Sequence, residues 1–216
     1  MATNGAPLLS GRAYIGAVQL ALGTLRTKLR AARGFHDADV TCDCCGRVES
    51  LGHILQVCPR SHRARNARHD RVVDLAYTRF TELGYEVVLE PRILTPMGYR
   101  RPDLVAWKAG CSAIVVDATV LADNADLDRE HDHKSSYYDV PAVRDYVGQL
   151  AGLDASRVQF RAVVFNWRGA MSLKSASDLR RCGFSDNSLE LMGLRVLEGG
   201  MAIYMAFQRG TYREGT

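Results

Sequence analysis

Two aspartates lie in a stretch that is otherwise largely apolar, "RRPDLVAWKAGCSAIVVDATV" at residues 100–120. The stretch reads as two strands about Ala109-Gly110, and residues that face each other across such a hairpin have numbers that sum to about 220. Asp103 and Asp117 should therefore be cross-strand neighbours, with Cβ atoms roughly 5 Å apart. Two carboxylates this close repel each other, and a divalent cation relieves the repulsion. Oxygen ligands of this kind suit Mg²⁺, which could generate a nucleophile from bound water for attack on a phosphodiester.

A simpler interpretation of the two aspartates is a structural ion pair. Arg100 or Arg101 stands close enough in the chain to neutralise one of the carboxylates. The hairpin geometry favours neither interpretation over the other.

A lysine on the next predicted helix favours the metal interpretation. Lys134 shares a helix face with Glu130, His131, Tyr137 and Tyr138, which lie three or four residues away. If this helix packs beside the sheet, the ammonium could orient an attacking water or stabilise negative charge on a phosphate. The alternative is an ordinary surface pair between Glu130 and Lys134.

A second group of residues has metal-ligand spacing. Cys42, Cys45, His53 and Cys58 follow the pattern C-x2-C-x7-H-x4-C, which is typical of a structural zinc site. Cys44 is a competing ligand, although adjacent residues point apart and Cys42 gives the more usual loop. Four of the six cysteines cluster in residues 42–58, and no secretory signal precedes them. This clustering indicates a metal site in a reducing intracellular compartment rather than a disulfide framework.

The elements that must position these residues follow from periodicity and turn signals. We predict helices over about 11–33, about 68–83 with a stop at Gly84, 124–138 and 142–151, and a mostly helical remainder after residue 170. We predict strands over 85–93, 101–108, 111–121 and 157–167, with a turn in "TPMGYR". This order implies an α/β fold, a mixed sheet of about four strands flanked by helices.

Composition and charge narrow the class of partner. Of the 216 residues, 47% are hydrophobic and 24% charged, as in globular proteins, and no apolar run is long enough to span a bilayer, so no membrane association is expected. The net charge is +4, but no acidic residue occurs between Met1 and His36, and a second basic cluster follows at Arg60, Arg63, Arg65, Arg68 and Arg71. Such asymmetry indicates a phosphate-bearing partner, with solvated helix faces as the alternative.

At this point the motifs resemble those of a known family. "RPD", thirteen residues, "DAT" and then the helical lysine of "HKSSYY" are similar to the PD-(D/E)XK restriction-like endonuclease pattern, in the variant whose lysine has moved from a strand to the following helix. With the CCHC cluster and "RHD" upstream, residues 12–165 resemble the C-terminal endonuclease region of site-specific non-LTR retrotransposon polyproteins that insert into ribosomal RNA genes.

The resemblance implies a site and a cofactor. Asp103 and Asp117 would hold the catalytic Mg²⁺, and Lys134 would be the third catalytic residue. Thr119 stands where the wider superfamily carries its lysine, so His131 and His133 remain alternatives to Lys134. From the basic cluster, "RHD" and the face of the aspartates, we expect DNA contacts at Arg65, Arg68, His69, Arg71 and Arg101.

The resemblance also implies an organisation and partners. We divide the chain into a basic helical lead-in (1–40), a CCHC zinc knuckle (41–60), a restriction-like endonuclease core (66–170) and a C-terminal helical extension (171–216). The implied activity is nicking of double-stranded DNA in the nucleus, which primes reverse transcription of element RNA. No Asp-Asp dipeptide occurs, so reverse transcription is expected only from the polymerase portion of a longer polyprotein, of which this chain is expected to be the terminal fragment.

Two other functions remain open from the residues alone. The first is a non-catalytic module in which the zinc knuckle and basic helices bind nucleic acid on a decayed nuclease fold. The second is a purely structural interaction domain, favoured by the acidic residues of 124–138, which would repel phosphates.

Overall fold

The computed structural model describes residues 10–213, with side chains as far as residue 210. Residues 1–9 of the predicted lead-in and 214–216 of the predicted extension lie outside the described residues. The chain divides into two compact units, one comprising the residues up to Arg68 and from Leu197 onward, and a larger one comprising His69–Val196.

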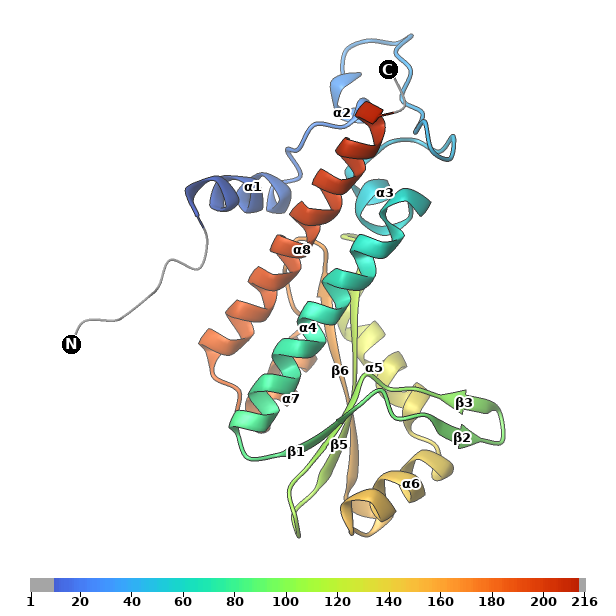
Figure 1. The fold of residues 1–216 in the computed structure, drawn as a ribbon, viewed down its shortest axis with the longest axis vertical. Coiled ribbons are helices and arrows are strands. Elements are labelled where there is room, and N and C mark those ends of the chain that lie inside the picture. Colours follow the sequence, from blue (N-terminus) through green and yellow to red (C-terminus); the bar gives the residue numbers. More distant parts are fainter. Residues whose placement is uncertain (1–9, 214–216) are drawn as a thin grey trace, which may run out of the picture. The chain divides into compact units, whose positions relative to one another are not determined.

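The larger unit is built on a mixed sheet of four strands in the order β1-β4-β5-β6 (Figure 1). Its strands are β1 (Glu86–Leu89), β4 (Leu104–Trp107), β5 (Ala113–Leu121) and β6 (Val158–Asn166). The first three pair antiparallel, and β6 runs parallel to β5. A parallel pair needs a long crossover connection, which here consists of two helices, α5 (Leu127–Tyr138) and α6 (Pro141–Ala151). The predicted mixed sheet of four strands flanked by helices is confirmed.

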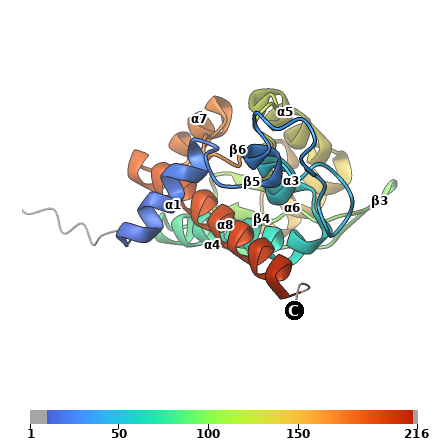
Figure 2. The ribbon, with the colours of Figure 1, turned by 90° about the horizontal axis from the view of Figure 1, so that it is seen from above.

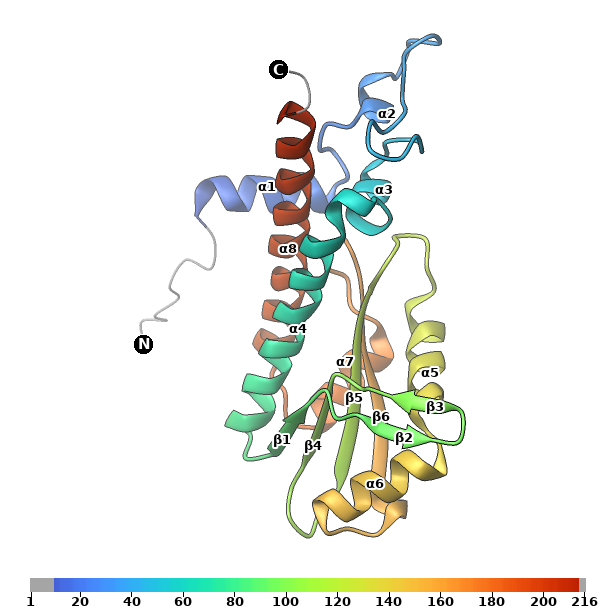
Figure 3. The ribbon, with the colours of Figure 1, turned by 45° about the vertical axis from the view of Figure 1, so that its right-hand side comes forward.

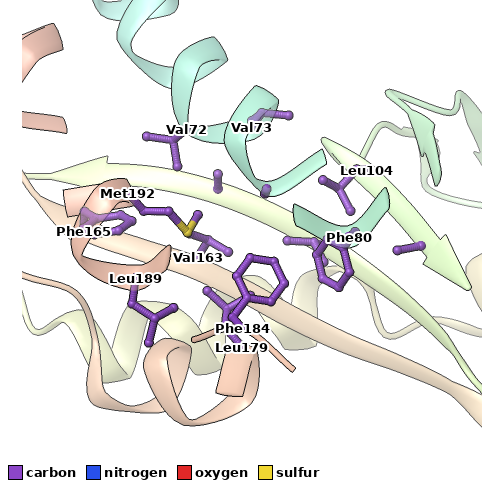
Figure 4. Close-up of a cluster of buried hydrophobic side chains, with 14 of the residues drawn as sticks. Val72, Val73, Phe80, Leu104, Val163, Phe165, Leu179, Phe184, Leu189 and Met192 are labelled. Atoms are coloured by element: carbon purple, nitrogen blue, oxygen red, sulfur yellow. The ribbon is translucent and has the colours of Figure 1, made fainter. Parts of the chain in front are cut away.

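Both faces of the sheet are covered, which explains why apolar residues dominate both faces of its central strands. On one face, helix α4 (His62–Glu82), helix α7 (Leu173–Arg181) and the first part of helix α8 (Asp186–Arg213) enclose a core that includes Phe80, Phe165 and Met192 (Figure 4). On the other face, α6 and the end of α5 enclose a second core that includes Trp107, Val143 and Phe160. The view in Figure 2 shows α4 and α5 on opposite sides of the strands.

Helix α4 has the apolar spacing that the sequence predicts. Val72, Ala76 and Phe80 recur at helical intervals and are buried in the first core. The helix ends at Glu82, and Gly84 follows with a φ of +80°, a left-handed conformation that glycine adopts without strain. The predicted stop at Gly84 is therefore confirmed.

The prediction of one continuous strand over 85–93 is wrong, because β1 ends at Leu89. Glu90 has a φ of +47°, which a strand does not accommodate, and the chain turns away from the sheet there. The residues predicted as a turn then form most of a separate two-stranded ribbon, β2 (Ile93–Thr95) and β3 (Gly98–Arg100). The following strand, β4, starts at Leu104 rather than at 101, two residues after Pro102, which has no N–H for a strand ladder.

The acidic segment before and within α5 has local partners. Asp126 caps the helix by accepting a hydrogen bond from Arg129 N. Asp128 accepts one from Ser172 Oγ at 2.6 Å, and Lys174 Nζ lies 2.5 Å from Asp132. These carboxylates therefore help fasten α5 to the start of α7, which explains a feature that the sequence left without a role.

The smaller unit contains several short helices. They are α1 (Gly11–Ala21), α2 (Lys28–Ala31), α3 (Leu51–Gln56) and the 3-10 helix η1 (Pro59–Ser61). The predicted continuous helical region 11–33 is wrong, because Gly23 has a φ of +66° and Thr27 caps a new helix through its side chain. Within the described residues, no helix combines the length and apolar character that crossing a membrane requires.

The end of α6 generates a stability prediction. Gly148 is buried, and a Cβ there would lie 2.8 Å from the carbonyl oxygen of Leu153, whose N–H bonds back to the Gly148 carbonyl. Alanine favours helices over glycine by about 1 kcal/mol, but overpacking against fixed backbone typically costs about 1–3 kcal/mol. We therefore expect Gly148→Ala to lower the urea midpoint of unfolding followed by circular dichroism.

Gln149→Ala is the matched control, because Gln149 is the exposed neighbour on the same helix turn. It should leave the midpoint nearly unchanged. A Gly148→Ala protein as stable as the control would show that the end of α6 relaxes freely around a methyl group.

Candidate functional site

The two aspartates meet where the predicted register places them. β4 and β5 pair Leu104 with Val116 and Trp107 with Ala113, so the next pair beyond the strand is Asp103 with Asp117. Asp103 lies just before β4, and its Oδ2 accepts a hydrogen bond of 2.6 Å from Ala118 N on β5. One carboxylate is thus tied to the backbone of the strand that carries the other.

Asp117 is held by two groups from the crossover helix. Its side chain lies within β5 and is buried, because strands and helices cover both faces of the sheet there. Tyr138 Oη donates to Asp117 Oδ1 at 2.7 Å, and Lys134 Nζ lies 2.9 Å from Oδ2. Lys134 and Tyr138 are four residues apart on α5, which places them on one face of the helix.

Burial and like charge oppose ionisation of Asp117. Desolvation raises its pKa first, and the Asp103 carboxylate raises it further, although Lys134 and Tyr138 act in the other direction. For Lys134, burial is the largest single influence and acts to lower the pKa, but the carboxylates of Asp117, Glu130 and Asp103 together outweigh it and the pKa is raised. Lys134 therefore carries its positive charge at neutral pH.

His69 brings a second positive charge from helix α4. Its Nε2 lies 3.1 Å from Asp103 Oδ2, and this hydrogen bond raises the pKa of His69 to about 9. Beside this pair lies a hollow of about 270 Å³, lined by His69, Asp70, Val73, Asp74, Leu89, Glu90 and Asp103. Asp103 can thus be approached from solvent.

The structural ion pair considered for the aspartates is not formed by either arginine. Arg101 pairs with Glu90, and the Arg100 guanidinium lies over the Tyr137 ring at 4.1 Å. Residues 101–103 lie outside the strands, before β4. The side chain of Arg101 therefore does not follow the strand alternation that would place it on the same face as Asp103.

The histidines considered as substitutes for Lys134 lie elsewhere. His131 is buried, and its Nε2 lies 3.1 Å from Asp178 Oδ2. The imidazole of His133 pairs with Glu130 at 3.4 Å on the exposed side of α5. The Glu130 carboxylate is thus paired with His133, whereas the ion pair of Lys134 is with Asp117.

The five residues expected to contact DNA differ in their exposure and in their partners within the chain. Arg71 and Arg101 are exposed, whereas His69 bonds to Asp103 as described. Arg65 donates to Cys58 O and Ser61 Oγ, each at 2.7 Å. Arg68 departs most from the expectation, because its side chain is buried and donates to Gln56.

Sequence reasoning missed two contacts of the aspartates. It assigned His69 to DNA rather than to Asp103, and it named Tyr138 as a face neighbour of Lys134 without a partner. The position of Tyr138 four residues after Lys134 was an available signal. The His69 contact spans 34 residues of chain, and no local pattern indicates it.

The Cys/His cluster forms a compact set of four ligand atoms in the smaller unit. One atom each from Cys42, Cys45, His53 and Cys58 lies within 4.8 Å of the others. The cysteine pair flanks a turn closed by hydrogen bonds to Cys42 O, and Ser50 caps helix α3 so that His53 faces the turn. Cys44 is exposed and outside the cluster, which removes it as a competing ligand.

The spacing within the cluster fits zinc. Cys42 and Cys58 have their Sγ atoms 3.9 Å apart, and Cys45 Sγ lies 3.5 Å from His53 Nε2. Tetrahedral coordination with zinc–sulfur bonds of about 2.3 Å requires an S–S separation of about 3.8 Å. Burial raises the pKa of Cys58 to about 12, so an unliganded thiolate is disfavoured there. A bound cation would stabilise the thiolate form. The four residues could therefore bind zinc.

Comparison with known proteins gives a consistent set of relatives, although no protein-family model matches the chain. The Pol polyprotein of the type-2 retrotransposable element R2DM of Drosophila melanogaster is 31% identical over 93% of this chain and 19% of the relative. The type-1 R2 Pol polyprotein of Nasonia vitripennis is 30% identical over 89% of this chain and 19% of the relative. The type-1 R2 Pol polyprotein of Bradysia coprophila is 31% identical over 94% of this chain and 23% of the relative. The homologues of this chain are thus Pol polyproteins of R2 retrotransposable elements, and the chain spans about a fifth of the length of these three relatives.

Proposed function

We propose that this chain is the endonuclease region of a retrotransposon polyprotein and nicks one strand of duplex DNA with Mg²⁺. The observation that carries the proposal is the convergence of Asp103, Asp117 and Lys134 at the start of the β4–β5 hairpin. The restriction-like form of the fold is part of the same proposal, supported by the mixed four-stranded sheet with this site at its centre.

The carboxylates present fit a magnesium ion. Apart from the Lys134 ion pair, Asp117 Oδ2 is buried and has no hydrogen-bond donor. The pairs described for Asp103 use only its Oδ2. Asp103 and Asp117 would hold the ion, with waters and a substrate phosphate completing its shell. When bound, Mg²⁺ supplies Lewis-acid stabilisation of a phosphodiester and lowers the pKa of a coordinated water.

The remaining residues of the site have distinct roles in this proposal. Lys134, charged at neutral pH, stabilises negative charge on the phosphate and is unsuited to remove a proton. His69 positions Asp103 by donating to Oδ2. Tyr138 orients Asp117 by donating to Oδ1, which leaves Oδ2 turned toward Lys134.

The homologues supply the context of the reaction. Because they are retrotransposon Pol polyproteins, we propose that the 3′ hydroxyl freed by the nick primes reverse transcription of element RNA by the polymerase portion of the same polyprotein. A chromosomal target requires action in the nucleus. The exposed Arg71 and Arg101 are suited to contact phosphates of the target duplex.

The first test is removal of one carboxylate charge. Asp117→Asn should lower the nicking rate of supercoiled plasmid in Mg²⁺ by about 10³-fold, because the metal contributes several kcal/mol and each 1.4 kcal/mol is a factor of ten. DNA affinity, measured by fluorescence anisotropy without Mg²⁺, should be retained. Asp145→Asn, an exposed carboxylate on α6, should nick at the wild-type rate.

A wild-type chain that binds duplex DNA but never nicks it with Mg²⁺ or Mn²⁺ would instead favour the non-catalytic binding module. Nicking that persists unchanged in Asp117→Asn would remove the aspartates from the mechanism.

The second test separates Lys134 from other lysines of the same region. Lys134→Gln should slow nicking by about 10²- to 10³-fold, the usual effect of removing one group that stabilises developing charge. Lys174→Gln is the control, because its ammonium pairs with Asp132. Equal nicking by Lys134→Gln and wild type would assign the charge-stabilising role to another group.

We also propose that the Cys42, Cys45, His53 and Cys58 cluster binds one structural zinc ion. In small modules, zinc binding contributes folding free energy of about 10 kcal/mol or more at neutral pH. Purified chain should contain one zinc atom per molecule by plasma mass spectrometry. Cys58→Ser should lose the zinc, whereas Cys44→Ser should retain it, because Cys44 is exposed and outside the cluster.

Zinc loss in both cysteine variants, or a wild-type chain free of zinc after purification without chelators, would contradict the assignment. The measurement does not depend on nicking, so its result stands apart from the two activity tests.

A further inference from the structure

The β2–β3 ribbon has one face with no role in the fold. Ile93 and Thr95 point inward and are buried, and Ile93 belongs to the core under α6. Leu94 points the other way, as alternation along a strand requires, and its cross-strand partner is Tyr99. Figure 1 shows the ribbon to one side of the four-stranded sheet, and Figure 3 shows it in front of the sheet strands.

This outward face is apolar and exposed. Leu94 is 66% exposed, Met97 at the tip 84% and Tyr99 54%. Three large apolar side chains in solvent within six residues exceed the scattered single exposures that are normal on a protein surface. Such a face indicates a partner.

The charge around the apolar face selects the kind of partner. Residues 91–102 contain Arg92, Arg100 and Arg101 and no acidic residue, and of these three Arg101 is paired with Glu90. The Arg92 guanidinium lies 3.8 Å from the centre of the Tyr99 ring, which holds this charge at the border of the face. Apolar side chains bordered by arginines fit a nucleic-acid groove, in which apolar residues meet bases and arginines meet phosphates.

The distance along the chain places this face beside the aspartates. Tyr99 is four positions and Met97 six positions before Asp103 in the chain, so they lie at most roughly 14 and 22 Å from it. Duplex DNA advances about 3.4 Å per base pair, so this reach corresponds to roughly four to six base pairs. A duplex whose phosphate lies at Asp103 and Asp117 therefore comes within this reach of the ribbon.

We infer that the β2–β3 ribbon enters a groove of the target duplex next to the scissile phosphate, with Leu94 and Met97 against the bases and Arg92 on a phosphate. The inference rests on the proposed function for the position of the DNA. It adds a contact element that helps determine where the nick falls.

The test removes the apolar contact and leaves the charges in place. The double variant Leu94→Ser/Met97→Ser retains the stack of Arg92 on Tyr99, and both side chains are exposed, so the thermal unfolding midpoint should not change. Its affinity for a linear duplex, measured by fluorescence anisotropy without Mg²⁺, should fall about ten- to a hundredfold. The slope of log affinity against log salt should stay the same, because no charge is removed.

Two single variants calibrate this result. Arg92→Gln should reduce the salt slope by about one, the effect of one lost phosphate contact. Leu173→Ser removes an exposed leucine of α7, 79% exposed and outside the ribbon, and should bind as tightly as wild type.

Unchanged affinity in the double variant would overturn the inference even if the wild type nicks DNA. Unchanged affinity together with loss of a dimer in sedimentation would overturn it in favour of a contact between copies of the chain. If the wild type never nicks but the double variant still binds more weakly, the nuclease proposal fails and the ribbon contact stands.

Discussion

The site depends on two like charges that the fold places together in a partly desolvated position. Asp117 is buried, and its neighbour across the hairpin is another carboxylate, so burial first and the charge of Asp103 second raise the pKa of Asp117. The chain offsets this repulsion with one cation from each side, His69 from α4 and Lys134 from α5. The two helices pack on opposite faces of the sheet. Their packing therefore fixes the positions of the two cations beside the aspartates.

Much of the candidate site could be predicted because it depends on residues that are close together in the sequence. The hairpin register follows from Gly110 at the turn, since each strand residue then has a fixed partner. The apolar spacing of Val72, Ala76 and Phe80 and the stop at Gly84 likewise follow from local rules. The Cys/His spacing was equally local, and the four ligand atoms do gather.

The parts that could not be predicted involve contacts distant in the chain or unusual backbone. His69 meets Asp103, and Asp128 meets Ser172, across 34 and 44 residues respectively. The left-handed Glu90 broke the predicted strand 85–93, and Pro91, which is disfavoured inside a sheet, was the one local signal of the break. Arg68 belongs to a basic cluster in the sequence and was therefore expected on the surface. It lies on the buried face of α4. Composition gives the charge of a segment but not the direction in which each side chain points.

The placement of the lysine on a helix rather than on a strand has a consequence for how such a site evolves. A strand residue two positions from Asp117, such as Thr119, would keep its direction as long as the sheet keeps its pairing. An α-helix turns about 100° with each residue, so one insertion or deletion within α5 before Lys134 would rotate Lys134 away from Asp117 while leaving both carboxylates in register. The number of α5 residues before Lys134 is therefore expected to vary less than the length of the loop before the helix, and a chain with such a change would keep both aspartates but lose the ion pair.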